Sequence, residues 1–376
     1  MRQKIWSQMP LFIGIVLLSI LIALPTGYED AVIYKGTDRC AATVVSVDNS
    51  TIIDTGLIRS GEQKCTIRLD GGRFKGQETS GINMLTGSLE QDKIFQEGDR
   101  AMVVISYKDD TILSVNMIDI YRMDKELWLG IAFALLLVCF AGKKGFQSLL
   151  SFGITILSIW KIIVPSCLNG MNAILISLLV VSILTAVIFA LVYGFDRRFL
   201  TAVCGSLLGI AATCILGILL TDAFQIHGAV MPYSESLIYS GFENLNLTQI
   251  FMSSIFIGAS GAVMDLAVDI TSAIHEVVEK RPDISRWEAV KSGVHVGRAA
   301  MGTMTTTLLL AYSGGYLALL MVFMAQGTPI YNILNYKHVA SEILHTVVGS
   351  IGLVTVAPFT AMVGGMMLTR KKRAEN

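Results

Sequence analysis

Long apolar runs succeed one another along most of the chain. A helix that crosses the hydrocarbon core of a bilayer needs roughly 20 mostly apolar residues. The runs that come within a few residues of this length are 9–25, 126–142, 146–166, 171–194, 199–221, 248–271, 300–325 and 341–368. The last run contains Pro358, which allows it to bend. The pattern predicts a polytopic α-helical membrane protein with about 8 transmembrane helices.

Residues 28–123 follow a different pattern, because apolar and polar residues alternate there. The alternating runs are CAATVVSV, QKCTIRL, RAMVVISY and TILSVNMIDIY. Turn-forming residues separate them, which is typical of short antiparallel strands. The sequence predicts a small all-β barrel or sandwich here, with an OB-like barrel as one form. The expected organisation is a first transmembrane helix (1–27), a β domain (28–123) and a seven-helix membrane domain (124–376).

Composition supports a membrane protein, and the placement of charge predicts its orientation. Only 15% of the residues are charged, against about 25% in soluble domains. Most of the Lys and Arg residues next to the predicted spans lie at one set of helix ends. They are Arg2, Lys4, Lys143, Lys144, Arg197, Arg198, Lys280, Arg281, Arg286, Lys291, Arg298 and the basic residues of 370–373. The short loops at the opposite ends hold almost no Lys or Arg apart from Lys337. The positive-inside rule therefore predicts that both termini are cytoplasmic and that the β domain is extracytoplasmic.

Several alternatives and exclusions follow from the same residues. The first apolar run could be a cleaved signal peptide, which would leave seven spans with the same orientation. The net charge is zero, and no basic stripe with interleaved aromatic residues occurs, so we expect no nucleic acid partner. No cysteine pair has CxxC spacing and no ATP-binding motif is present, so we expect no metal and no cofactor.

Two cysteines of the β domain, Cys40 and Cys65, allow two interpretations. An extracytoplasmic, oxidising location favours a disulfide between them. The alternative is that they are two unrelated buried thiols. The sequence leaves both interpretations open.

The sixth predicted span carries carboxylates, Asp265 and Asp269, in the stretch GASGAVMDLAVDITSAIHE. Residues four apart share a helix face, and an ionised carboxylate inside a bilayer is costly unless it faces protein or water. We therefore expect a proton or cation relay, with Asp265 facing the interior of the bundle. The alternative is that both carboxylates lie past the membrane edge and pair with Arg298 or Lys291.

Other polar residues in the last three predicted spans are further candidates. Glu342 and His345 share a helix face near the outer surface, where they could receive a proton or bind a cation. The alternative interpretation is that both residues lie in a solvated first turn of the helix. Ser260, Thr303 and Thr306 could line a hydrated path, although hydroxyl residues in membrane helices more often serve close packing.

Ser260 also lies in GASG, which matches the GxSG motif of intramembrane serine proteases. A Ser–His pair must lie within hydrogen-bond reach. The predicted depths of Ser260 and His345 differ by roughly 12 Å along their helices. We therefore expect no enzyme activity.

Three segments in order resemble the YibE/F-like family of bacterial multi-pass membrane proteins: GASGAVMDLAVDITSAIHEV (258–277), SGVHVGRAAMGTMTTTLLLAYSGG (292–315) and ASEILHTVVGSIGLVTVAPFTA (340–361). Asp265 matches the aspartate of the family pattern. Thr306 stands where the pattern tends to have Asn, and Ala318 where it commonly has Pro. The resemblance implies the bacterial cytoplasmic membrane and directs attention to residues 258–361, but it supplies no activity.

Two classes of function fit these observations. The first is a secondary transporter or permease for a small molecule or ion, with a carboxylate relay through Asp265. The second is a non-transporting assembly or regulatory factor whose β domain binds a partner. The expected partners are the lipid bilayer, a substrate of unknown identity, and another membrane subunit or a second copy of the chain.

The orientation can be tested by mapping which residues are accessible from each side of the membrane. Single-cysteine labelling or reporter fusions should place residues 30–120 and 225–245 outside and residues 279–296 inside, because Lys and Arg are retained on the cytoplasmic side. Labelling of 279–296 from outside would reverse the orientation.

Overall fold

The computed structural model describes residues 2–29, 31 and 36–369, with side chains from residue 8 onward. The chain divides into two compact units. One unit comprises Met1–Tyr28 and Phe140–Asn376 and is helical, and the other comprises Glu29–Cys139 and contains all the described strands. The predicted basic cluster at residues 370–373 lies outside the described residues, as do the side chains of Arg2 and Lys4.

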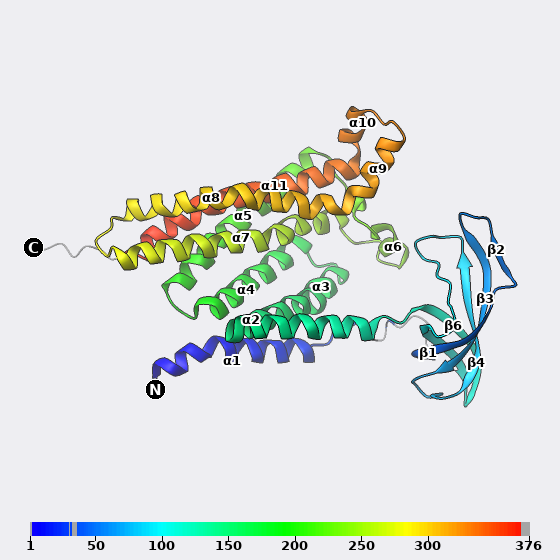
Figure 1. Cartoon of the computed structure of the whole chain (residues 1–376). Coiled ribbons are helices and arrows are strands. Elements are labelled where there is room, and N and C mark those ends of the chain that lie inside the picture. The colour runs from blue at the N-terminus through cyan, green and yellow to red at the C-terminus, as the bar shows by residue number, and fades with distance from the viewer. Residues whose placement is uncertain (1, 30, 32–35, 370–376) are drawn as a thin grey trace, which may run out of the picture. The chain divides into compact units, whose positions relative to one another are not determined.

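The β unit contains six strands that close into a barrel (Figure 1). They are β1 (Thr37–Asp48), β2 (Ile52–Asp54), β3 (Arg59–Leu69), β4 (Glu78–Thr86), β5 (Arg100–Lys108) and β6 (Thr111–Ile120). The sheet order is β1-β5-β6-β4-β3-β2, and an additional β1–β3 pairing closes it. Leaving aside the short β2, this is a five-stranded barrel with crossed connections, in keeping with the expected OB-like form.

The alternating pattern predicted β1, β3, β5 and β6 but not β4. The inward positions of β4 are Gly81, Asn83 and Leu85, so a missing side chain and an amide interrupt its apolar face. Asn83 is fully buried, and its Nδ2 donates hydrogen bonds to Lys93 O (2.6 Å) and to Gln63 Oε1 (3.1 Å). Gln63 in turn exchanges hydrogen bonds with the backbone of Phe95. The barrel core therefore contains a hydrogen-bonded polar network that periodicity alone does not reveal.

The disulfide interpretation is wrong, because Cys40 and Cys65 are both free thiols. Cys65 pairs with Val47 of β1, which is seven residues from Cys40, or about 23 Å along an extended strand. A disulfide needs Cα atoms about 4.4–6.8 Å apart. Both thiols instead pack in the barrel core, where burial raises the pKa of Cys65 to about 11. The alternative of two separate buried thiols is the one that the structure supports.

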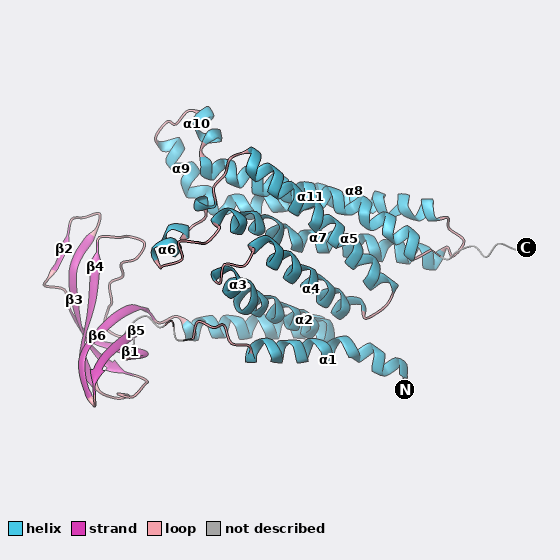
Figure 2. Cartoon of the chain, turned by 180° about the vertical axis from the view of Figure 1, so that it is seen from behind, coloured by secondary structure: helices cyan, strands magenta, loops and turns pink. Residues whose placement is uncertain are grey.

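The other unit and its connection to the barrel consist of helices (Figure 2). They are α1 (Arg2–Ala23), α2 (Met123–Ser158), η1 (Ile159–Ile163), α3 (Val164–Leu168), α4 (Ala173–Tyr193), α5 (Arg197–Ala223), η2 (Gly228–Val230), α6 (Ser234–Tyr239), α7 (Leu247–Lys280), α8 (Arg286–Ser313), η3 (Gly314–Tyr316), α9 (Leu317–Ala325), α10 (Ile330–Asn335) and α11 (Lys337–Met367).

The expected number of eight spans is not confirmed. Within the described residues, six helical segments are long and apolar enough to cross a membrane, and a shorter apolar stretch, Gln8–Ala23, lies in α1. The predicted spans 126–142 and 146–166 fall in a single segment, Met123–Leu168. Its backbone leaves helical geometry at Gly142, where φ is 54° and ψ is −126°. The segment therefore consists of two helices that meet at Gly142, next to the gap that the sequence predicts between these two spans.

Helices α7 and α8 are longer than predicted. α7 continues nine residues beyond the expected end at residue 271, and α8 begins fourteen residues before the expected start at residue 300. Ser285 and Glu288 form a reciprocal capping box that starts α8. The predicted cytoplasmic connection is therefore mostly helical, because amphipathic turns continue both helices past their apolar runs.

Helices α5, α7, α8 and α11 pack side by side as the main bundle, with α11 against the other three (Figures 1 and 2). Glycines allow this close approach. A Cβ added at Gly209 of α5 would lie 2.7 Å from Val356 Cβ, and one added at Gly297 of α8 would lie 2.9 Å from Ala357 Cβ. Small residues at helix contacts are how membrane helices gain packing energy.

Candidate functional site

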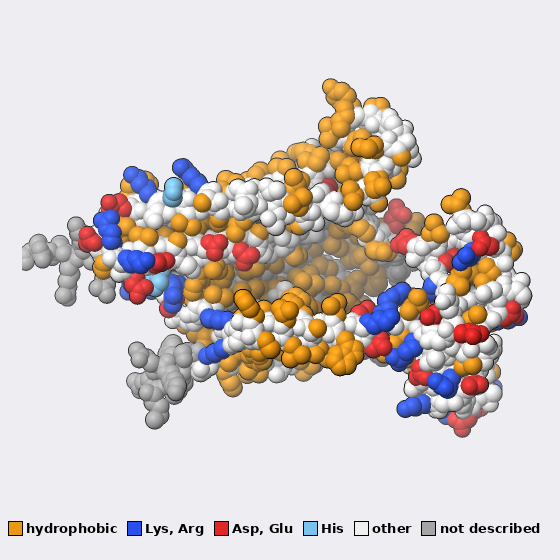
Figure 3. All heavy atoms as spheres, viewed as in Figure 1, with side chains coloured by type: hydrophobic (Ala, Val, Ile, Leu, Met, Phe, Trp, Pro, Cys, Tyr) orange, Lys and Arg blue, Asp and Glu red, His pale blue; other side chains and the backbone are white. Residues whose placement is uncertain are grey.

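Asp265 and Asp269 lie on an exposed face of α7, not in the interior of the bundle as the sequence suggested. Asp265 is the nineteenth of the 34 residues of α7, counting Leu247 as the first, so it lies close to the middle of the helix. Figure 3 shows acidic side chains part-way along α7, on a surface that is otherwise largely hydrophobic or uncharged there. Among the described residues, neither Arg298 nor Lys291 forms an ion pair with these carboxylates.

The position of these carboxylates has a physical consequence. A charged side chain in direct contact with lipid near the bilayer centre is costly, so such residues face water, protein or a compensating charge. The hydrogen bonds of the Tyr193 hydroxyl to Val268 O (2.9 Å) and Ser272 Oγ (2.8 Å) bring α4 beside this stretch of α7. The outward face of α7 is therefore a polar strip on a membrane helix that needs a hydrated or protein-covered environment.

A second polar group lies near the other end of α7, centred on His345 of α11. His345 Nε2 lies 2.9 Å from Ser254 Oγ on α7. The ring of Tyr312, from α8, meets the His345 ring edge-on at 5.3 Å, and Phe251 covers it at 5.5 Å. Three helices therefore hold the imidazole in one orientation.

Glu342 lies one turn before His345, beside the same cavity. The cavity has a volume of about 390 Å³ and is lined by Tyr312, Tyr316, Ser254, Glu342 and His345 among others. Two buried oxygen atoms here, Glu342 Oε1 and the Tyr312 hydroxyl, have no hydrogen-bond partner among the residues that the structure describes. Buried polar atoms are normally satisfied, so this cavity is suited to hold water or a polar ligand.

One face of α7 links the two polar groups. Ser254, Gly258, Gly261, Asp265 and Asp269 follow one another at helical spacings of three or four residues, which places them along one side of the helix. The face runs about 22 Å from Ser254 to Asp269. Its middle is formed by Gly258, which lies against the Tyr312 hydroxyl, and by Gly261, beside which the space is open.

The glycines of the motif region have different roles. Gly349 and Gly352 are buried at contacts with α7 and α5, as expected for close helix packing. Gly258 instead leaves room for the Tyr312 hydroxyl, which a Cβ at this position would displace. Gly261 has no atom within 4 Å of such a Cβ.

The remaining predicted path residues do not join this face. Ser260 is 8% exposed, and its hydroxyl donates to Ile257 O (2.7 Å) within α7. Thr303 and Thr306 lie on an exposed face of α8, and their hydroxyls donate to carbonyl oxygens of their own helix. The structure therefore brings Glu342 and His345 together and leaves these three apart from them.

Sequence reasoning missed Ser254 and Tyr312, which complete the cluster around His345. Ser254 precedes the quoted motif, and an aromatic residue near the end of a membrane helix is ordinarily an interfacial anchor. The Ser254 hydroxyl also donates to Phe251 O at 2.7 Å, and the tautomer of His345 decides which partner donates in the Ser254–His345 pair.

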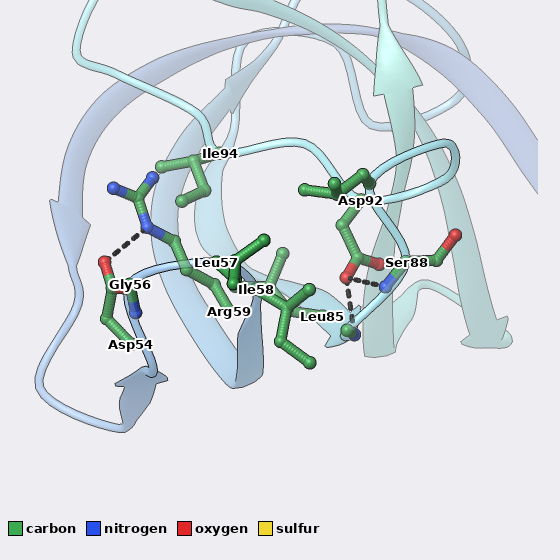
Figure 4. A pocket seen from close by; sticks show the side chains of 11 residues that line it. Asp54, Gly56, Leu57, Ile58, Arg59, Leu85, Ser88, Asp92 and Ile94 are labelled. Atoms are coloured by element: carbon green, nitrogen blue, oxygen red, sulfur yellow. Dashed lines mark hydrogen bonds and ion pairs between the residues drawn. The ribbon is translucent and has the colours of Figure 1, made fainter. Parts of the chain in front are cut away.

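The β unit has a separate cavity of about 310 Å³, lined by aliphatic side chains and by charged or polar ones (Figure 4). Ile58, Leu85 and Ile94 line it, and the side chains of Leu57 and Leu89 at its rim are 81% and 76% exposed. Two turns hold the rim. Asp54 accepts a hydrogen bond from Arg59 Nε (2.7 Å), and Asp92 accepts bonds from the backbone N–H groups of Thr86, Gly87 and Ser88. The bond from Thr86 contributes most to lowering the pKa of Asp92.

The contact between Gly258 and Tyr312 can be tested by substitution. Gly258→Ala should destabilise the bundle by about 1–3 kcal/mol, because the added methyl group displaces the Tyr312 hydroxyl. Gly261→Ala is the matched control and should be neutral or slightly stabilising. The measurement is unfolding of the purified protein in detergent. Tyr312→Phe should recover most of the Gly258→Ala loss, and equal effects of the two glycine substitutions would contradict the contact.

Comparison with known proteins identifies the family. The family described as "YibE/F-like protein" matches residues 129–370, which is well over half of the chain and includes every helix of the candidate site. No curated protein and no solved structure matches the chain. The described helices include six that are long and apolar enough to span a membrane. Because the family model matches residues 129–370, the chain belongs to the YibE/F-like family.

Proposed function

We propose that the protein is a secondary transporter or permease that uses intramembrane carboxylates as a proton or cation relay. The observation that carries the proposal is the polar face of α7, which extends from the cavity of Glu342 and His345 to Asp265 and Asp269. Ionisable residues within membrane spans are typical of proton relays and ion pathways. The substrate is a small molecule or an ion.

The geometry constrains how such a relay would operate. Ser254 and Asp265 are about 16 Å apart along α7, far beyond the length of one hydrogen bond. Proton movement between the two groups therefore requires intervening water or a change in helix packing, and the open space beside Gly261 can accommodate water. With both termini in the cytoplasm, the Glu342 end opens outward and Asp269 lies closer to the cytoplasm.

Substitution of the central carboxylate tests the relay. In proteoliposomes subjected to a pH step, Asp265→Asn should reduce the transient current at least about tenfold, because the amide retains size and polarity but cannot bind a proton. Asp269→Asn should have a smaller effect and shift the pH at which the current is half-maximal. Solid-supported membrane electrophysiology measures these currents directly.

The control is Asp283→Asn, in the connection between α7 and α8, where the carboxylate is exposed and lies off the polar face of α7. It should leave the current unchanged. Wild-type current in Asp265→Asn, with normal insertion, would exclude the relay. Failure of Asp265→Asn to accumulate would assign the carboxylate a structural pairing role instead.

The exposed leucines at the cavity of the β unit support a second candidate function, a non-transporting assembly or regulatory factor. Exposed leucines at the rim of a cavity, such as Leu57 and Leu89, are typical of interaction sites. A photo-crosslinking residue at Leu89 should give one adduct of defined mass in cells, and Leu57→Asp should abolish it. The matched position is Leu113 on β6, which is 66% exposed and lies outside the cavity. Equal crosslinking at Leu113 would remove this candidate.

A further inference from the structure

Glu342 lies between two cavities. The polar side is the cavity of about 390 Å³, whose lining includes the polar side chains of His345 and Tyr312 beside apolar residues such as Val230 and Phe251. On the other side is a cavity of about 200 Å³ whose other walls are mainly aliphatic, including Leu309, Leu320 and Val347. Glu342 and Tyr316 line both cavities, so a single ligand can contact both.

The polar side has the chemistry of a cation site. Among the described residues, no Lys, Arg or His forms an ion pair with Glu342, and its Oε1 atom is buried without a hydrogen-bond partner. The aromatic rings of Tyr312, Tyr316 and Phe251 line the same cavity. A buried carboxylate with aromatic rings around it favours an organic ammonium group, which gains both charge pairing and cation–π attraction.

A metal ion explains the site less well. Within the part of the chain that the structure describes, no group of three or more His, Cys, Asp and Glu side chains is placed to hold a metal. An aliphatic cavity beside the carboxylate would also have no use in metal coordination. Leu309, Leu320 and Val347 are 51%, 41% and 48% exposed, so the apolar side is open to the surface that lipid would cover.

We propose that the two cavities form one binding site for an amphipathic organic cation, with its cationic head against Glu342, Tyr312 and Tyr316 and its apolar part among Leu309, Leu320 and Val347. This inference rests on the proposed transport function and names its substrate class. The ligand enters from the bilayer side and displaces the proton or water at Glu342. Proton and cation compete for one carboxylate, which couples their movements.

The test uses the full chain in lipid nanodiscs and three probes of similar shape. Phenyltrimethylammonium has a cationic head and an apolar ring, tetramethylammonium has only the head, and tert-butylbenzene has the same shape as the first without charge. Isothermal titration should show binding of phenyltrimethylammonium and at least about tenfold weaker binding of the other two. Equal affinities for phenyltrimethylammonium and tert-butylbenzene, or no binding of either, would overturn the proposal.

Substitution and pH give independent readouts of the carboxylate. Glu342→Gln should weaken phenyltrimethylammonium binding at least about tenfold, whereas Glu235→Gln, an exposed carboxylate on α6, should not change it. In the unmodified protein, affinity should fall towards about tenfold per pH unit in the acid range where Glu342 is protonated. The other titratable groups nearby are His345, Tyr312, Tyr316 and His338.

Three results decide between this inference and the proposed function. Affinity that does not fall with acid, or is unchanged in Glu342→Gln, overturns the cation site. If pH-step currents still depend on Asp265 in that case, only the substrate class is wrong. If the currents are also unaffected by Asp265→Asn, the transport function fails as well.

Discussion

Close contact between α11 and its neighbours is the constraint on which the candidate site depends. Gly209 of α5 and Gly297 of α8 leave no room for a Cβ against Val356 and Ala357 of α11. These contacts fix the rotation of α11 in the bundle. The rotation of α11 in turn decides that His345, on the same helix, meets Ser254 of α7 and Tyr312 of α8. The contacts of Val356 and Ala357 thus position the imidazole of His345, which lies several turns away along α11.

The same packing gives α7 one face that is buried in the bundle and one that is exposed. Its inner face is buried and mainly apolar, with Ile270 and Ile274 against the glycines of α8. Its outer face carries Asp265 and Asp269. Close packing of this inner face against α8 stabilises the helix within the bundle, so the outer face is free to carry polar groups. A helix that was apolar on both sides would be easier to insert but could not carry protons.

The β unit is stabilised in a different way, with a hydrogen-bonded pair of amide side chains inside an apolar barrel. Gln63 and Asn83 have no exposed surface, and their hydrogen bonds reach Phe95, Lys93 and Asn49. Such a network fixes the connection between β4 and β5 against the barrel. The rim of the cavity in this unit is held by separate hydrogen-bonded turns at Asp54 and Asp92, which flank the exposed leucines.

The sequence alone determined the features that depend on local periodicity. Apolar runs located the membrane-capable helices, alternation located four of the strands, and the spacing of Glu342 and His345 placed them on one helix face. Tertiary structure decided which way each face points. Asp265 faces outward, Cys40 and Cys65 lie far apart in register, and Ser254 and Tyr312 join His345. The physical reason is that helix rotation and strand register follow from contacts between residues distant in the chain, such as Gly209 with Val356, which no local pattern encodes.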